Sequence, residues 1–229
     1  MNNVKDNPDY RNRRGIFSDR FDAGEHLAQM LGPEFAEDPQ GIVLAIPSGG
    51  VPVGQVISYR LNLAFDLILV RKVQIPWNTE AGFGAVAYRG QTLLNQKLVD
   101  SLGLSEDQIR EQIEVTRQEL EKRNNDFRGG KPFPDLAGKT AILTDDGLAS
   151  GYTMLAAIET IREHGIGKVI LALPTAPLHS LENVAPYADM VNAVQIKEKG
   201  AFAVAEAYRN WRDLSRQEVV KMMRHPFGK

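Results

Sequence analysis

Short apolar runs alternate with amphipathic segments through the middle of this chain. Each run is about as long as a buried β-strand, and the segments after the first four runs have the periodicity or start signals of helices. The expected strands cover residues 42–46, 65–70, 141–143, 168–173 and 190–194, and the expected helices cover 52–61, 105–124, 154–163 and 178–187. This alternation predicts an α/β fold with a doubly wound parallel sheet and right-handed crossovers.

The longest expected helix, residues 105–124, differs from the others. Ser105 and Gln108 have the spacing of a capping box, which fixes the start of the helix. Its apolar face is only a narrow stripe on a charged surface, made of Ile109, Ile113, Thr116 and Leu120. A narrow stripe packs against one neighbour only. We therefore predict that this helix lies outside the core or at a subunit contact, without a chemical role, and it suggests a homodimer.

The two ends of the chain fall outside the alternation. Residues 1–15 are polar and rich in charge, which predicts a mobile or loosely docked arm. Residues 16–195 hold the expected core, and in the tail, residues 196–229, three aromatic side chains precede a final amphipathic helix. The amino terminus lacks the apolar segment of a signal peptide, so we expect a cytoplasmic protein.

The length, net charge and cysteine content of the chain limit the kinds of function to expect. A chain of 229 residues suits one α/β domain with an elaboration, or two small domains. The formal net charge of −2 gives no electrostatic reason to expect nucleic acid or a membrane as a partner. The chain has no cysteine, which excludes disulfides, thiolate catalysis and cysteine-based metal sites.

The main chemical signal is the sequence TAILTDDGLASGYT at residues 140–153. Two carboxylates, Asp145 and Asp146, stand at the carboxyl end of an expected strand, where ligands bind in open α/β sheets. Carboxylates at that position accept hydrogen bonds from the hydroxyls of a sugar. The next residues place unpaired backbone N–H groups and two hydroxyls at a helix start, which favours an anion. These two ends fit a ribose phosphate, and a solvated Asp-Asp-Gly turn is the alternative.

At these residues the chain resembles the type I phosphoribosyltransferases. In that family the paired acids hold the ribose hydroxyls of phosphoribosyl pyrophosphate, and the loop after them binds the phosphate ester. The resemblance gives the first role to Asp145 and Asp146 and the second to Gly147, Ala149, Ser150, Gly151, Tyr152 and Thr153. Ser150 stands where threonine is commoner, which keeps the hydroxyl. The resemblance also implies Mg²⁺ near the two acids, held mainly by ligand oxygens and water, and a small hood built from the terminal segments.

A second loop carries a pyrophosphate signal. Ser48, Gly49 and Gly50 follow the first expected strand, and successive glycines let backbone N–H groups turn toward an anion. In the family this loop grips the pyrophosphate, although related sequences often have arginine where Ser48 stands. Arg71 and Lys72 end the next expected strand, where they would take up charge on the departing pyrophosphate. The alternatives are a tight turn at the glycines and solvated charges at the strand end.

The resemblance further implies a mobile loop that closes over the reacting centre. We expect this lid at residues 77–82, within a loop at about 74–82, where Glu80 is the only acid. Glu80 would steady positive charge on the sugar ring or help to place the acceptor, and an ordinary loop carboxylate is the alternative. In the hood, Phe202 or Tyr208 would stack on the acceptor ring, with core packing as the alternative. The expected catalytic set is Asp145, Asp146, Lys72 and Glu80.

Four segments in order make the chain similar to a branch of the family whose acceptors are poorly defined: SGGVPVG, RKVQIPWNTEAGFGAVA, TDDGLASGYTM and LPTAP. The resemblance implies transfer of the phosphoribosyl group from phosphoribosyl pyrophosphate to a nitrogen acceptor, a nucleobase-like ring, with release of pyrophosphate. Two alternatives stay open. One is a sensor that binds phosphoribosyl pyrophosphate or a nucleotide without turnover, and the other is a flavodoxin-like module that binds another phosphate.

Overall fold

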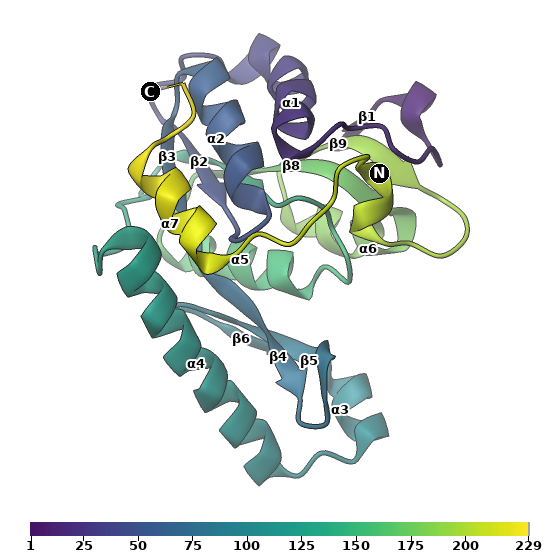
Figure 1. Ribbon diagram of the computed structural model, residues 1–229, viewed down its shortest axis with the longest axis vertical. Coiled ribbons are helices and arrows are strands. Elements are labelled where there is room, and N and C mark those ends of the chain that lie inside the picture. Colours follow the sequence, from purple (N-terminus) through teal and green to yellow (C-terminus); the bar gives the residue numbers. More distant parts are fainter. Residues whose placement is uncertain (229) are drawn as a thin grey trace.

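A parallel sheet of six strands forms the centre of the computed structural model, which describes residues 1–228 except the side chains of residues 79 and 80 (Figure 1). The strands are β1 (Val4–Asp6), β2 (Gly41–Ala45), β3 (Ala64–Leu67), β7 (Thr140–Thr144), β8 (Lys168–Pro177) and β9 (Met190–Lys197). Their order is β1-β9-β8-β7-β2-β3, so the chain steps from β2 to β3, returns to β7 on the other side of β2, and continues outward. The strand order therefore reverses between β2 and β7. The predicted fold class is confirmed.

Helices cover both faces of this sheet. α1 (Arg20–Phe35) and α2 (Gly50–Leu61) pack on one face, and α5 (Tyr152–Glu163) and α6 (Leu178–Val184) pack on the other. Alternate residues of β2 serve the two sides: Ile42 and Leu44 join the core under α5, whereas Val43 joins the core under α1 and α2. Because both faces are buried, the strands read as continuous apolar runs in the sequence.

A second, antiparallel sheet extends from the core between β3 and β7. It consists of β4 (Val70–Ile75), β5 (Asn78–Ala87) and β6 (Thr92–Leu94), followed by α3 (Gln96–Leu102) and α4 (Glu106–Arg128). Figure 1 shows α4 running alongside this sheet, below the main one. The predicted strand at 65–70 is wrong in extent, because the buried residues Ile68 and Leu69 carry the chain from one sheet to the other. Arg71 and Lys72 consequently lie inside β4 and not at the end of a core strand.

The segment at residues 74–82, predicted as a loop, forms the distal part of a β-hairpin. β4 and β5 pair antiparallel, with register shifts between Val73 and Ile75. The turn lies at Pro76 and Trp77, and Trp77 is 61% exposed. The side chain of Glu80 lies outside the described residues. The prediction of an open loop is wrong here, and the role of this segment as a lid stays a prediction.

α4 connects the two sheets. Its predicted capping box is confirmed, since the Gln108 N–H donates to Ser105 Oγ and the Ser105 N–H donates to Gln108 Oε1. The apolar stripe packs against the antiparallel sheet, where Leu120 is buried. At the other end, the Arg128 guanidinium donates to both carboxylate oxygens of Asp66 in β3, at 2.8 and 2.9 Å. The helix is thus fixed to the main sheet by its last turn. The homodimer stays a prediction.

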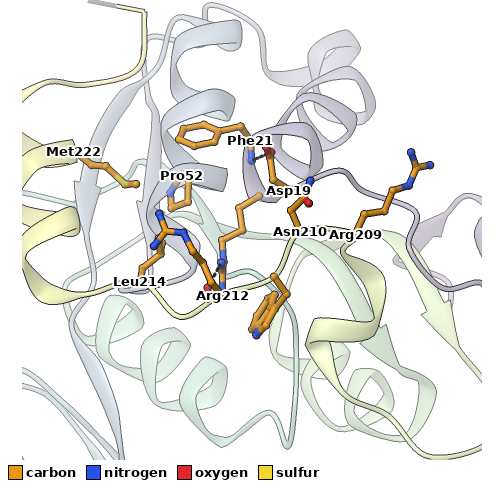
Figure 2. A pocket seen from close by; sticks show the side chains of 10 residues that line it. Asp19, Phe21, Pro52, Arg209, Asn210, Arg212, Leu214 and Met222 are labelled. Atoms are coloured by element: carbon orange, nitrogen blue, oxygen red, sulfur yellow. Dashed lines mark hydrogen bonds between the residues drawn. The ribbon is translucent and has the colours of Figure 1, made fainter.

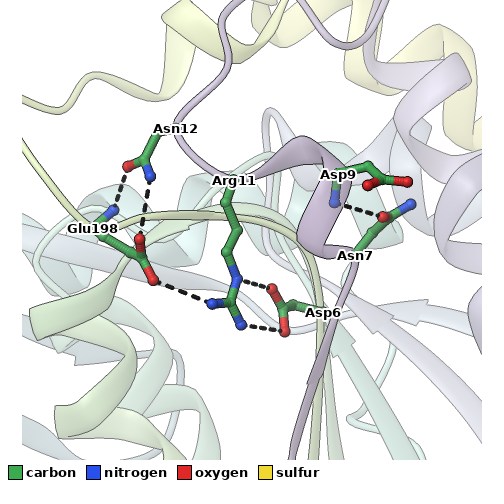
Figure 3. A network of polar contacts seen from close by, with 6 residues as sticks. All are labelled: Asp6, Asn7, Asp9, Arg11, Asn12 and Glu198. Carbon is green, nitrogen blue, oxygen red and sulfur yellow. Dashed lines mark hydrogen bonds and ion pairs between the residues drawn. The ribbon is translucent and has the colours of Figure 1, made fainter.

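The amino-terminal arm, predicted to be loose, is docked as the edge strand of the main sheet. β1 pairs in parallel with β9. Figure 3 shows Arg11 donating to both oxygens of Asp6, at 2.6 and 3.0 Å, and to Glu198 beyond β9 at 3.2 Å. The Asn12 side chain also bonds to Glu198, whose N–H donates to Asn12 Oδ1 at 2.8 Å. The polar residues that suggested a loose arm therefore pair with one another and with the end of β9. A 3-10 turn, η1 (Pro8–Tyr10), links these contacts.

The tail crosses the molecule toward the antiparallel sheet. After η3 (Val204–Ala207) it reaches α7 (Arg216–Arg224), which contacts both α2 and α4. Gln55 of α2 donates to the Met222 carbonyl at 2.8 Å, which ties α7 to the core. A further 3-10 turn, η2 (Ala185–Tyr187), follows α6. No helix within residues 1–228 is long and apolar enough to cross a bilayer.

Candidate active site

The carboxyl end of β7 carries the two predicted acids. Asp145 and Asp146 follow the last residue of β7, at the point where the strand order reverses. Both side chains line one cavity of about 320 Å³. The same cavity is lined by Ile46, Pro47, Ser48, Gly49, Val70, Arg71, Lys72, Arg123 and Thr153. The structure thus brings residues predicted to bind sugar and residues predicted to bind pyrophosphate around one space.

The two carboxylates have different surroundings. Asp146 Oδ2 accepts a hydrogen bond from Arg20 Nε at 2.8 Å, and Arg20 Nη2 lies 2.8 Å from the same oxygen. Asp145 Oδ1 accepts from the Asp146 N–H at 2.8 Å. Burial raises the pKa of Asp145 well above its usual range, and the adjacent charge of Asp146 raises it further. Burial also raises the pKa of Asp146, and the positive charge of Arg20 opposes that rise. One guanidinium therefore compensates one of two neighbouring negative charges.

Arg20 is a site residue that the sequence analysis missed. It begins α1, 126 positions before its partner in the chain, and no local motif marks it. Its guanidinium lies 3.9 Å from the centre of the Trp211 ring, and Nη1 donates to the Arg212 carbonyl at 2.9 Å. The tail therefore holds Arg20 in place, and Arg20 in turn holds Asp146.

The turn after the acids has the features of an anion site. A separate cavity of about 80 Å³, room for several waters or one small anion, is lined by Asp145, Gly147, Leu148, Ala149, Ser150, Gly151, Thr153 and Met154. Within residues 1–228, no backbone carbonyl accepts a hydrogen bond from the N–H groups of residues 149–154. These groups surround the start of α5, where the helix dipole favours negative charge. Tyr152 packs its ring against the core instead of lining the cavity.

Glycine is required where the loops after β2 and β7 meet. A Cβ on Gly49 would lie 1.8 Å from Asp146 Oδ2, and one on Gly50 would lie 2.8 Å from the Thr144 carbonyl oxygen. The Pro47–Ser48 peptide bond is cis. In the described part of the chain, no hydrogen bond uses the N–H groups of Ser48 and Gly49, so both are available to a ligand. The loop predicted to grip pyrophosphate thus lies directly against the acids.

Three basic side chains line the other side of this cavity. Arg71 and Lys72 come from β4, and Arg123 comes from α4. Arg123 thus places a charged side chain of α4 at this cavity, and the prediction that α4 has no chemical role stays untested. A sequence signal existed: Arg123 lies three residues after Leu120 and four before Phe127, both buried, so it shares their side of the helix.

The predicted acceptor residues lie elsewhere. Tyr208 is 5% exposed, its ring packs between Phe17 and Trp211, and its hydroxyl donates to the Asp146 carbonyl at 2.5 Å. This burial favours core packing, the alternative to stacking on an acceptor ring, and the stacking role of Tyr208 stays a prediction. Phe202 is half-buried and lines neither cavity described above.

A larger cavity of about 460 Å³ is lined partly by Arg20 (Figure 2). The residues that line it are Asp19, Arg20, Phe21, Pro52, Arg209, Asn210, Trp211, Arg212, Leu214 and Met222. Figure 2 shows Pro52 of α2 close to Arg212 and Leu214 of the tail, with Asn210 and Arg209 beyond Asp19. Arg20 lines this cavity and Asp146 lines the cavity of the two acids, so the ion pair between them connects the two spaces.

The fold and the cavity between β2 and β7 define an α/β protein with acids, free amides and basic side chains at the switch point of its sheet. Residues 18–209 match the phosphoribosyl transferase domain, and the chain belongs to that family. This confirms the resemblance found in the sequence.

Two comparisons place the chain more closely. A Mycobacterium tuberculosis protein named "putative phosphoribosyl transferase" is 36% identical over 208 residues, which cover 91% of this chain and 46% of that protein, in both strains H37Rv and CDC 1551. The chain therefore spans about half the length of these curated relatives. The crystal structure of TT1426 from Thermus thermophilus superposes with a TM-score of 0.73 at 31% identity, covering 90% of this chain and 97% of that one.

Proposed function

We propose that the protein transfers the phosphoribosyl group of phosphoribosyl pyrophosphate to a nitrogen atom of a nucleobase-like acceptor and releases pyrophosphate. The observation that carries this proposal is the shared cavity at the switch point. Its acids suit ribose hydroxyls, its free loop amides and basic side chains suit pyrophosphate, and the turn at residues 147–153 beside it suits a phosphate ester.

In the proposed reaction the bond between ribose C1 and the pyrophosphate oxygen breaks, and its electron pair leaves with pyrophosphate. A nitrogen lone pair of the acceptor forms the new bond to C1, and the nitrogen loses its proton to solvent. Positive charge on the sugar ring and negative charge on the leaving group both increase in the transition state. Asp145 and Asp146 would stabilise the first, while the amides of Ser48 and Gly49, with Arg71 and Lys72, would stabilise the second. Fixing both reactants in one orientation would supply much of the remaining acceleration.

Mg²⁺ belongs to this proposal as the cofactor. Asp145 and Asp146 supply carboxylate oxygens, the donor type that Mg²⁺ prefers. The described residues include no cluster of three or more acids, histidines or cysteines, which fits an ion held mainly by water and ligand oxygens. Such an ion would neutralise charge on pyrophosphate.

Calorimetric titration with phosphoribosyl pyrophosphate and Mg²⁺, followed by an assay of pyrophosphate release across a panel of nucleobases, tests the proposal. We expect binding, and release with at least one base. Binding without release under every condition would contradict transfer and would favour a sensor.

A matched pair of double variants tests the sugar contact. Asp145→Asn with Asp146→Asn should weaken binding of ribose 5-phosphate roughly 100-fold, because hydrogen bonds to charged groups contribute about 1.5–3 kcal/mol each. Asp107→Asn with Asp213→Asn removes the same charge from exposed positions and should change nothing. Unchanged binding by the first double variant would contradict ribose recognition and favour a module that binds another phosphate.

A further inference from the structure

Glu119 of α4 lies among three arginines that come from three different elements. Its Oε1 atom lies 3.3 Å from Arg123 Nε in the next turn, 3.7 Å from Arg71 Nη1 in β4, and 3.7 Å from Arg216 Nη2 in α7. Arg216 is also paired with Asp126. Arg71 and Arg123 therefore share a single carboxylate between them, and both line the cavity that holds the two site acids.

Because Glu119 is shared, the two half-buried arginines have one paired carboxylate between them, among the described residues, at this end of the site. The side chains of Arg71 and Arg123 are 27% and 19% exposed. Burial lowers the pKa of Arg123, and the positive charge of Arg71 lowers it further. In the described part of the chain, no ion pair within 4.0 Å joins either arginine to Asp145 or Asp146. An anion in the cavity would remove this excess, since buried charge is costly unless paired.

Another arginine on the same helix shows what a purely structural role looks like. Arg128 is fully bonded: Nε and Nη2 bind Asp66, Nη1 binds Asn124 Oδ1 and the Lys131 carbonyl, and Nη2 also binds the Pro132 carbonyl. Arg123 donates only through Nε, to Glu119, and among the described residues its two Nη groups have no hydrogen-bond partner. The Nη1 and Nη2 atoms of the Arg123 guanidinium are therefore available to a ligand.

We propose that Arg123 binds the pyrophosphate group directly, so that α4 contributes to the leaving-group subsite within the same chain. This inference rests on the proposed function. Glu119 would act as a positioning residue, because its Oε1 atom lies 3.7 Å from Arg71 Nη1 and 3.3 Å from Arg123 Nε and so bridges the two guanidinium groups. Arg216 extends this contact to α7, which places the carboxyl-terminal helix behind the leaving-group end of the site. A planar guanidinium suits two phosphate oxygens at once, and its charge would stabilise pyrophosphate as the bond to C1 breaks.

Titration with inorganic pyrophosphate and Mg²⁺ tests the assignment without requiring turnover. Arg123→Gln should weaken pyrophosphate binding roughly 10-fold to 100-fold, the loss expected for charge-assisted hydrogen bonds. Arg123→Lys keeps the charge but not the fork, and should fall between Arg123→Gln and the unchanged protein. The control is Arg117→Gln, which removes the same charge from an exposed position on α4 that lines a different cavity, and it should bind pyrophosphate normally.

Ribose 5-phosphate separates ligand contact from general damage. Arg123→Gln should bind it as the unchanged protein does, because the sugar and its phosphate are expected at the acids and the turn. Equal pyrophosphate affinity in Arg123→Gln and the unchanged protein would overturn the assignment, as would an equal loss of affinity for both ligands. If Arg123→Gln does not fold, three other variants decide. The assignment of Arg123 would be overturned if pyrophosphate bound normally to Arg123→Lys, Lys72→Gln and Arg71→Gln. An unchanged protein that binds neither phosphoribosyl pyrophosphate nor pyrophosphate would contradict the proposed function itself.

Discussion

The molecule contains two buried pairs of aspartate and arginine that use the same chemistry for different ends. One pair, Asp66 with Arg128, joins α4 to the main sheet, and the other, Asp146 with Arg20, lies at the candidate site. The arginine side chains are 2% and 8% exposed, and the aspartate side chains are 24% and 16% exposed. Burial alone therefore does not tell the two pairs apart.

Charge balance separates them. Arg128 meets both oxygens of its one carboxylate and fills its remaining donors with an amide and two carbonyls. Arg20 approaches a single oxygen of Asp146, and a second carboxylate, Asp145, lies beside it. The first pair is a closed structural contact. In the described part of the chain, the second pair leaves one carboxylate without a paired cation, and its oxygens can accept hydrogen bonds from a ligand in the cavity, as in a binding site.

The largest change in stability is expected at the structural pair. Arg128→Met should lower the free energy of unfolding by about 3 kcal/mol, the lower end of the range for breaking a buried pair, because Asp66 keeps some contact with water. Urea unfolding followed by circular dichroism measures it. A loss well under 1 kcal/mol would show that this pair is not what fixes α4 to the sheet.

A smaller loss is expected at the site pair. Arg20→Met should cost roughly 2 kcal/mol, since it removes charge-assisted hydrogen bonds but leaves Asp146 beside a cavity where it can take up a proton. The pKa of Asp146 should rise in this variant, because Arg20 is the cation that opposes the effect of burial. The stability deficit should therefore grow as pH rises from acid to alkaline conditions, which unfolding at several pH values measures. A deficit independent of pH would mean that Arg20 acts through packing on Trp211 alone.

A gain in stability is expected from Asp145→Asn. The pKa of Asp145 is raised in the folded state, so the protonated side chain stabilises the folded protein at low pH. This stabilisation is lost as the pH rises through the folded-state pKa. Asparagine has no charge to lose. The variant should melt roughly 2–4 °C higher, or about 1 kcal/mol, at neutral pH, and the difference should vanish in acid. Asp213→Asn, at an exposed position, is the control, and an Asp145→Asn protein less stable than the unchanged protein at neutral pH would contradict this account of the site.

The smallest effect is expected where the arginine is exposed, since the side chain of Arg11 is 40% exposed. Arg11→Gln breaks the pairs with Asp6 and Glu198 that dock the amino-terminal arm (Figure 3). Exposed pairs contribute little and are screened by salt. The melting temperature should fall slightly at low ionic strength and match that of the unchanged protein at high salt. A large fall at both ionic strengths would show that β1 contributes to the core of the sheet.

The local patterns in the sequence were sufficient to place the two acids and the turns at the ends of strands. Asp145, Asp146 and Ser48 to Gly50 stand at strand ends, and parallel strands bring their carboxyl ends to one edge of a sheet. The same patterns were insufficient at residues 65–75, because one apolar run supplies strands to two different sheets. They also could not reveal Arg20, since a lone arginine at a helix start has no spacing relation to an aspartate 126 residues away.

The sequence by itself determined most core strands of the main sheet and the helices after them, the glycines that let two loops meet, and the acids that lie beside them, because each depends on near neighbours along the chain. Only the tertiary structure decided which acid is neutralised, which arginines share Glu119, and that α4 reaches the cavity. Those outcomes depend on charges and buried surfaces that come from elements far apart in the sequence, and these elements meet only when the chain folds.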